Sequence, residues 1–118
     1  ALLERFWSFR HRKNLLKGKL CATVLTGLDP RVLDAINISL ATEIRDMERM
    51  ELMGQLTIQG NLPCVFCGEG DECEMSAFQL LYGTDAKTSE IGYTRVEDQK
   101  VIWEEAKRIG RLIGERLH

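Results

Sequence analysis

Three of the four cysteines of the chain lie within one short segment. Cys64 and Cys67 are separated by two residues, and Cys73 follows after Gly68 and Gly70. Two cysteines at this spacing can place both sulfurs on one metal ion, because the turn between them folds back and its amides point at the thiolates. Gly68 can adopt the positive φ that such a turn needs, and Gly70 gives Cys73 the freedom to return to the same centre. The segment is therefore predicted to be a metal or redox loop with these three cysteines as candidate ligands.

The spacing leaves three interpretations open: a bound zinc ion or iron–sulfur cluster, a redox-active dithiol, or inert buried thiols. Glycine and acidic residues fill the gaps between the cysteines, so packing alone would not bury the thiols. A site with three cysteines would need a further ligand, which Asp71, Glu72, water, a substrate or another chain could supply. Cys21 lies far away along the chain and is interpreted as a small core residue.

Composition narrows the class of protein. The chain has 118 residues, of which 44% are hydrophobic and 29% charged, as expected for one soluble globular domain. A net charge of −2 argues against a general nucleic-acid binder. There is no apolar run of ~20 residues and no signal-peptide pattern, so we expect no membrane partner and a cytoplasmic location. Cytoplasmic cysteines are kept reduced, which favours metal binding or catalysis over a structural disulfide.

Hydrophobic periodicity and helix-start signals predict the elements that must position the cysteines. The first strand is apolar throughout, as in a buried parallel sheet. The helix that follows begins with Asp29 as N-cap and Pro30 at its first position, and carries an apolar stripe. The stripe comprises Leu33, Ile36, Leu40, Ile44 and Met47. The expected elements are helices over 1–9, 30–47, 75–81 and 97–117, with strands over 20–26 and 50–60 and the cysteine loop after the second strand.

This order, helix, strand, helix, strand, cysteine loop and helix, is typical of a parallel unit of the α/β class. Two strands are too few for a self-sufficient parallel sheet, whose faces and edges must all be covered. We therefore expect a missing N-terminal half or a second copy of the chain to complete the sheet, the latter as a homo-oligomer.

Several stretches resemble the second half of flavodoxin-like NADPH-dependent FMN reductases and iron–sulfur flavoproteins. They are residues 1–7 (ALLERFW), residues 16–19 (LKGK) before the first strand, Thr26-Gly27 after it, and the strand that ends at Gly60. The resemblance covers nearly the whole chain and implies a three-layer flavodoxin-like parallel sheet, of which this is the C-terminal portion. It further implies that the first strand here is the fourth of five, and that the loop formed by Thr26, Gly27, Leu28 and Asp29 lies beside the isoalloxazine ring of FMN.

The sequence departs from that family in two ways. The family binds the FMN phosphate in a loop after its first strand, which this chain lacks. Its iron–sulfur members carry their cysteines in the N-terminal half, so the resemblance does not assign a cluster to Cys64, Cys67 and Cys73. Loops that follow adjacent parallel strands nevertheless emerge at the same carboxyl edge, so the Thr26–Asp29 loop and the cysteine loop should share one crevice.

The function predicted from these observations is an FMN-dependent oxidoreductase that uses flavin and a nicotinamide cofactor, NAD(P)H. In it, a single partial domain, 1–118, carries the cysteine loop as an insertion at 60–74. The alternative is a non-catalytic, zinc-stabilised dimerisation or docking module. No catalytic residue is assigned, since His11 and His118 are the only histidines and no Ser-His-Asp arrangement can be built. No phosphate-binding glycine motif is present either.

Overall fold

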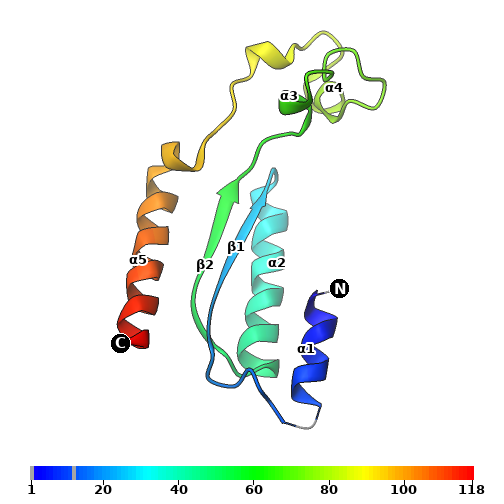
Figure 1. Cartoon of the computed structure of the whole chain (residues 1–118). Helices are drawn as coiled ribbons and strands as arrows, with labels where there is room; N and C mark the ends of the chain where they lie inside the picture. The colour runs from blue at the N-terminus through cyan, green and yellow to red at the C-terminus, as the bar shows by residue number, and fades with distance from the viewer. Residues whose placement is uncertain (1, 12) are drawn as a thin grey trace.

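The computed structural model describes residues 2–11 and 13–118. Its body is a pair of parallel strands, β1 and β2, with α2 on one face and α5 on the other, and with α1 beside α2 (Figure 1). The chain is thus of the mixed α/β class, as predicted. The helices are α1 (Leu2–Arg10), α2 (Pro30–Thr42), α3 (Cys64–Cys67), α4 (Ala77–Tyr82) and α5 (Lys100–Leu117), with a π-helical turn η1 (Glu43–Met47), two 3-10 turns η2 (Thr88–Glu90) and η3 (Val96–Asp98), and strands β1 (Leu20–Gly27) and β2 (Glu51–Gln59).

The helix signals at the start of α2 are confirmed. The Asp29 side chain accepts a hydrogen bond from the Arg31 backbone N–H, and Pro30 occupies the first turn. The predicted apolar stripe is only partly right. Leu33 and Ile44 are buried against the sheet, whereas Ile36 and Met47 are exposed.

A polar network replaces part of that stripe. The buried Asn37 side chain donates to Thr57 Oγ1 at 2.8 Å, and the Gln55 amide donates to the Asn37 carbonyl at 2.9 Å. The Thr23 hydroxyl donates to Asn37 Oδ1 at 3.3 Å. Because every one of these polar groups has a partner, the interface between α2 and the sheet tolerates their burial.

The opposite face of β2 is covered by α5, and Gly54 allows the helix to pack closely against the strand. An added Cβ at Gly54 would lie within 2.5 Å of Ile109 Cγ1, and Ile109 is itself buried. The glycine that interrupts the second strand pattern therefore makes room for the helix. Leu56, two residues further along the same face, is buried as well.

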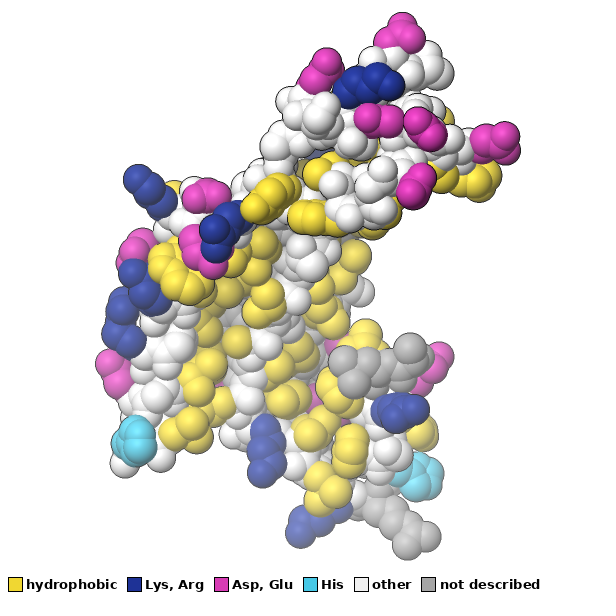
Figure 2. Space-filling view, turned by 45° about the horizontal axis from the view of Figure 1, so that its top comes forward, with side chains coloured by type: hydrophobic (Ala, Val, Ile, Leu, Met, Phe, Trp, Pro, Cys, Tyr) yellow, Lys and Arg dark blue, Asp and Glu magenta, His cyan; other side chains and the backbone are white. Residues whose placement is uncertain are grey.

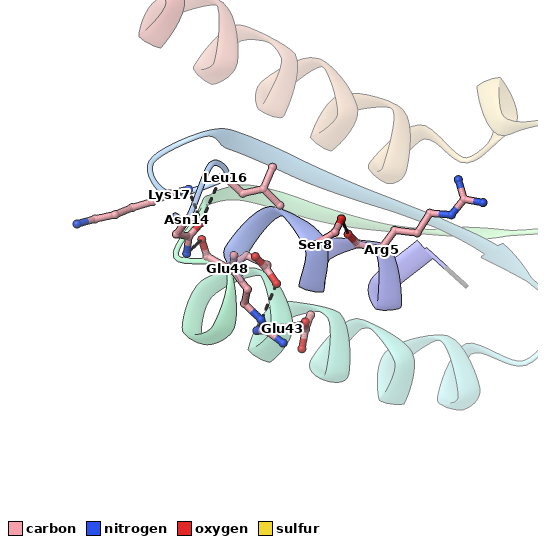
Figure 3. Close-up of polar contacts among 8 residues, drawn as sticks. Arg5, Ser8, Asn14, Leu16, Lys17, Glu43 and Glu48 are labelled. Atoms are coloured by element: carbon pink, nitrogen blue, oxygen red, sulfur yellow. Dashed lines mark hydrogen bonds and ion pairs between the residues drawn. The ribbon is translucent and has the colours of Figure 1, made fainter. Parts of the chain in front are cut away.

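A buried ion pair ties α1 to the end of the α2–η1 helix. Arg10 Nη1 lies 3.3 Å from Glu48 Oε1, and the Glu48 side chain is 0% exposed. No described residue donates a hydrogen bond to either carboxylate oxygen of Glu48. The Asn14 side chain donates to the Glu48 carbonyl at 3.0 Å (Figure 3). These contacts fasten the N-terminal helix to the turn that leads into β2.

Beyond the carboxyl ends of the strands, residues 63–93 form a separate lobe, here called the cysteine lobe (Figure 1). It contains α3, α4 and η2 around the fully buried Phe78. Gly68 ends α3 with φ 82°, so the predicted left-handed glycine is confirmed. Acidic side chains are prominent on the surface of the lobe (Figure 2).

The molecule exposes much more surface than a folded chain of its size should. Its accessible area is 8832 Å², whereas a compact 13.5 kDa monomer would expose about 6,500 Å². Its radius of gyration is 18.5 Å, against about 13.5 Å for a compact domain of this length. Hydrophobic side chains collect along the middle of the body (Figure 2), and Val24 of β1 is 60% exposed.

Candidate functional site

The two strands end together at one edge of the sheet. The Gly60 N–H donates to the Gly27 carbonyl at 2.8 Å, which extends the pairing of β1 and β2 by one bond. A Cβ at Gly60 would lie 2.8 Å from Thr26 Oγ1, so glycine is needed for this close approach. The turn after β1 and the segment after β2 therefore leave the sheet side by side, as the sequence predicts.

An open groove of about 520 Å³ lies between this edge and the cysteine lobe. Leu28 and Asp29, from the predicted cofactor loop, line it, whereas Thr26 and Gly27 do not. The complete lining is Leu28, Asp29, Pro30, Arg31, Gln59, Leu81 and Tyr82. A smaller hollow of about 90 Å³ continues inward from Leu28 and Tyr82 to Val65, Phe78 and Thr94. The larger groove is mainly apolar with a few polar groups, as small-molecule sites are, whereas the smaller hollow is lined mainly by polar surface.

Two larger surface hollows are poorer candidates. One, of about 640 Å³, runs along α2, and the other, of about 650 Å³, runs along α5. Each is lined almost entirely by one helix, so neither encloses a ligand from two sides. The groove at the carboxyl edge, in contrast, is formed by segments far apart in sequence.

The charges in the groove neutralise each other. Arg31 Nη2 donates to Asp29 Oδ2 at 3.0 Å, and Arg31 Nε donates to Asp29 Oδ1 at 3.2 Å. The Arg31 side chain, together with the Arg31 backbone N–H, holds the pKa of Asp29 below its ordinary value. The groove therefore offers no unpaired cation for a phosphate.

Two reciprocal pairs of hydrogen bonds hold the segment before α5, residues 94–99, against the end of β2. Asn61 Nδ2 donates to the Thr94 carbonyl at 2.9 Å, and the Thr94 N–H donates to Asn61 Oδ1 at 2.7 Å. The Gln59 N–H donates to Gln99 Oε1, and Gln99 Nε2 donates to the Gln59 carbonyl, both at 3.1 Å. Sequence reasoning missed Asn61 and Gln99; the position of Asn61 directly after a strand was the only available signal.

Cys64 and Cys67 are the first and last residues of α3. Cys64 is half-buried and Cys67 is exposed. The Cys67 thiol donates to the Cys64 carbonyl at 3.5 Å, so its sulfur lies back over the turn. Gly70 is packed against Cys64, since a Cβ there would lie 2.6 Å from the Cys64 carbonyl oxygen. Gly70 thus provides close contact rather than the freedom that the sequence suggested.

The Cys64 thiol faces the start of α4. The backbone N–H of Phe78, followed by the Ser76 hydroxyl and the Ala77 N–H, lowers the pKa of Cys64 from its ordinary value. The Ser76 hydroxyl hydrogen is already donated to the Gly70 carbonyl at 2.7 Å, so the backbone of Phe78 is the main cause of the lowered pKa of Cys64. The fold therefore supports the anionic form of Cys64.

Cys73 is half-buried, and its carbonyl accepts a hydrogen bond from the Ser76 N–H at 3.0 Å. Over residues 2–11 and 13–118, no three His, Cys, Asp or Glu side chains are grouped so that they could hold a metal ion. The structure thus brings Cys64 and Cys67 into one turn but does not assemble Cys64, Cys67 and Cys73 as a ligand set. All four thiols are free, and burial raises the pKa of Cys21 in β1.

In the described part of the chain, no helix is both long enough and apolar enough to cross a membrane.

Comparison with known proteins assigns no family to the chain. No protein-family model, no curated protein and no solved structure matches the sequence or the fold.

Proposed function

We propose that this chain belongs to an FMN-dependent oxidoreductase that takes electrons from NAD(P)H, and that it binds the isoalloxazine ring of the flavin. The observation that carries the proposal is the groove between the β1–α2 turn and the cysteine lobe. Ligands of parallel α/β folds bind outside the carboxyl ends of the strands, which is where this groove lies. Its volume of about 520 Å³ is within the usual range for a small-molecule site.

The lining suits a flat aromatic ring. Leu28, Leu81 and Tyr82 present exposed apolar surface to the groove, and Tyr82 adds a ring that can stack on a ligand. Gln59 supplies an amide that can donate to and accept from ring heteroatoms. When bound, FMN would supply the hydride and electron chemistry, and these side chains would hold its ring and exclude water from one face.

The groove does not suit a phosphate. Its one cation, Arg31, is already paired with Asp29. The phosphate anchor of FMN must then come from polypeptide outside the described groove. We therefore expect riboflavin, which lacks the phosphate, to bind this chain about as tightly as FMN does.

We further propose that the sheet is extended at the β1 edge into a three-layer, flavodoxin-like arrangement. β1 contains no charged residue and no proline, so nothing protects its free edge from another strand. Val24 pairs with Leu56 and lies on the face opposite to Thr23, which contacts α2, and its side chain is exposed. The excess accessible area, about 2,300 Å² over a compact chain, is what one partner buries in an obligate interface. The added strand comes from a second copy of this chain or from a longer polypeptide.

Flavin binding tests the main proposal directly. Riboflavin and FMN are each titrated with the purified chain, and quenching of flavin fluorescence is followed. We expect saturable binding of both, weakened by Leu81→Asp. Leu80→Asp is the matched control, because Leu80 is 86% exposed and does not line the groove. Absence of quenching at all protein concentrations, or equal loss in both variants, would contradict the proposal.

The zinc-stabilised docking module remains the alternative, and the paired cysteines of α3 are the observation that favours it. Elemental analysis of the same preparation separates the two. Stoichiometric zinc in a protein that binds no flavin supports the docking module. Flavin binding by zinc-free protein supports the oxidoreductase.

A further inference from the structure

We propose that Cys64 and Cys67 form a reversible disulfide across the α3 turn, which makes this turn a site of oxidation by small hydroperoxides. The inference goes beyond the flavin proposal and does not depend on it. It rests on the geometry of two cysteines in one helical turn and on the different surroundings of their sulfurs.

The turn brings the two side chains together. Cys64 and Cys67 are three residues apart in α3, and such residues stand on one side of a helix with their Cβ atoms about 5–6 Å apart. A disulfide needs this separation to fall to about 3.5–4.5 Å. The Cys67 thiol already donates to the Cys64 carbonyl at 3.5 Å, so its sulfur lies back along the turn. A small tightening of the turn is enough to close the bond.

The two sulfurs have complementary surroundings. Cys67 is exposed, so a small oxidant in solution can reach it. Cys64 is half-buried, with the amides of Phe78 and Ala77 directed at its sulfur. Cys67 is therefore the sulfur that meets the reactant, and Cys64 is the sulfur that completes the pair.

The reaction balances with a hydroperoxide as the oxidant. The Cys67 thiolate attacks the O–O bond, an S–O bond forms, and the leaving alkoxide or hydroxide takes up a proton. The Cys64 thiolate then attacks the Cys67 sulfenic acid, the S–S bond forms, and the S–O bond breaks to release hydroxide, which takes up the proton that Cys64 lost and becomes water. Overall, two thiols lose two electrons, and the hydroperoxide is reduced to an alcohol or water.

The same arrangement favours reduction by an external thiol. The incoming thiolate can reach the exposed Cys67 sulfur more easily than the half-buried Cys64 sulfur, and Cys64 then departs as a thiolate. A stabilised leaving thiolate speeds exchange, and the amides of Phe78 and Ala77 provide that stabilisation. The bond should therefore open readily with a small dithiol such as dithiothreitol.

The test needs only hydrogen peroxide and the intact chain without added flavin. Reduced protein is treated with peroxide, the remaining thiols are blocked with N-ethylmaleimide, and the intact mass is measured, followed by peptide mapping. We expect oxidation to remove about 2 Da and two maleimide additions. Mapping should locate the disulfide between Cys64 and Cys67, and dithiothreitol should restore both thiols.

Three variants make the assignment specific. In Cys64→Ser the Cys67 sulfenic acid has no partner and should be trapped by dimedone, whereas Cys73→Ser should form the disulfide as the unaltered chain does. Because Cys67 is exposed, Cys67→Ser leaves the packing intact, and this variant should form no disulfide. A disulfide that involves Cys73, a disulfide between chains, or cysteines that all resist peroxide would overturn the proposal. Because none of these peroxide experiments contains flavin, their outcome is independent of the flavin titration.

Discussion

Gly70 is the position at which one methyl group should disturb the cysteine lobe most. It is buried, and a Cβ there would lie 2.6 Å from the Cys64 carbonyl oxygen, 2.8 Å from Thr88 Cγ2 and 3.1 Å from Cys64 Cβ. Real Cβ contacts essentially never fall below 3.0 Å. In Gly70→Ala the Cys64 backbone must therefore move by at least about 0.4 Å, and backbone cannot swing aside as a flexible side chain can.

Overpacking of this kind costs about 1–3 kcal/mol of unfolding free energy. The lower entropy of alanine in the unfolded chain offsets about 0.4–1 kcal/mol of that cost. We expect Gly70→Ala to lose about 1–2 kcal/mol, equivalent to a fall in Tm of roughly 4–8 °C for a domain of this size. The displaced Cys64 should also form its disulfide with Cys67 more slowly.

Gly92→Ala is the matched control. Gly92 belongs to the same lobe, has no positive φ, and has nothing within 4 Å of an added Cβ. That variant should be as stable as the unaltered chain or slightly more so. Urea unfolding followed by circular dichroism gives the overall stability, and hydrogen exchange of the lobe amides gives the local one. If Gly70→Ala matches Gly92→Ala in both, the described contact between Gly70 and Cys64 is wrong.

Three further predictions concern the body of the molecule. Arg10→Ala should cost about 3–5 kcal/mol because it leaves the buried Glu48 carboxylate without its cation; Arg5→Ala, at an exposed site on the same helix, should change urea stability by less than about 0.5 kcal/mol. The pKa of Asp29 is lowered in the folded state, so its stabilising contribution is complete above the unfolded pKa of about 3.9 and is lost as pH falls through the folded pKa. Thermal melts of Asp29→Asn should accordingly depend less on pH in that acidic range than melts of the unaltered chain. If the free β1 edges of two copies of the chain pair with each other, light scattering should give a dimer, and Val24→Lys should convert that dimer to a monomer. A monomer in both cases leaves a longer polypeptide as the source of the added strand.

The sequence predicted the elements well where local signals were strong. β1, the Asp29 cap and Pro30 at the start of α2, and the left-handed Gly68 all appear where expected. The predicted burial of the first strand was wrong for this chain, because no residue of β1 is buried. Parallel pairing then determined that the β1–α2 turn and the segment after β2 share one edge, so a crevice at this edge was also predictable. The prediction that the cysteines share it was not met, because the lobe lines the groove with Leu81 and Tyr82 and not with Cys64, Cys67 or Cys73. The features that appear as expected depend on short-range chemistry or on topology alone.

What the sequence could not predict depends on contacts between distant residues. Asn37 lies where a helical stripe predicts an apolar side chain, because its partners come from both strands. Glu48 is buried because Arg10 reaches it from another helix. The spacing of the cysteines likewise predicted the turn between Cys64 and Cys67 but not the position of Cys73, which depends on how the whole lobe folds.

The central claim, that the groove between the β1–α2 turn and the cysteine lobe holds a flavin ring, is tested most directly by NMR. Amide chemical shifts of the ¹⁵N-labelled chain are recorded during a riboflavin titration. We predict that the largest changes occur at Leu28, Gln59, Leu81 and Tyr82, which line that groove from both sides. Unchanged spectra, or changes confined to the hollows along α2 or α5, would contradict the claim.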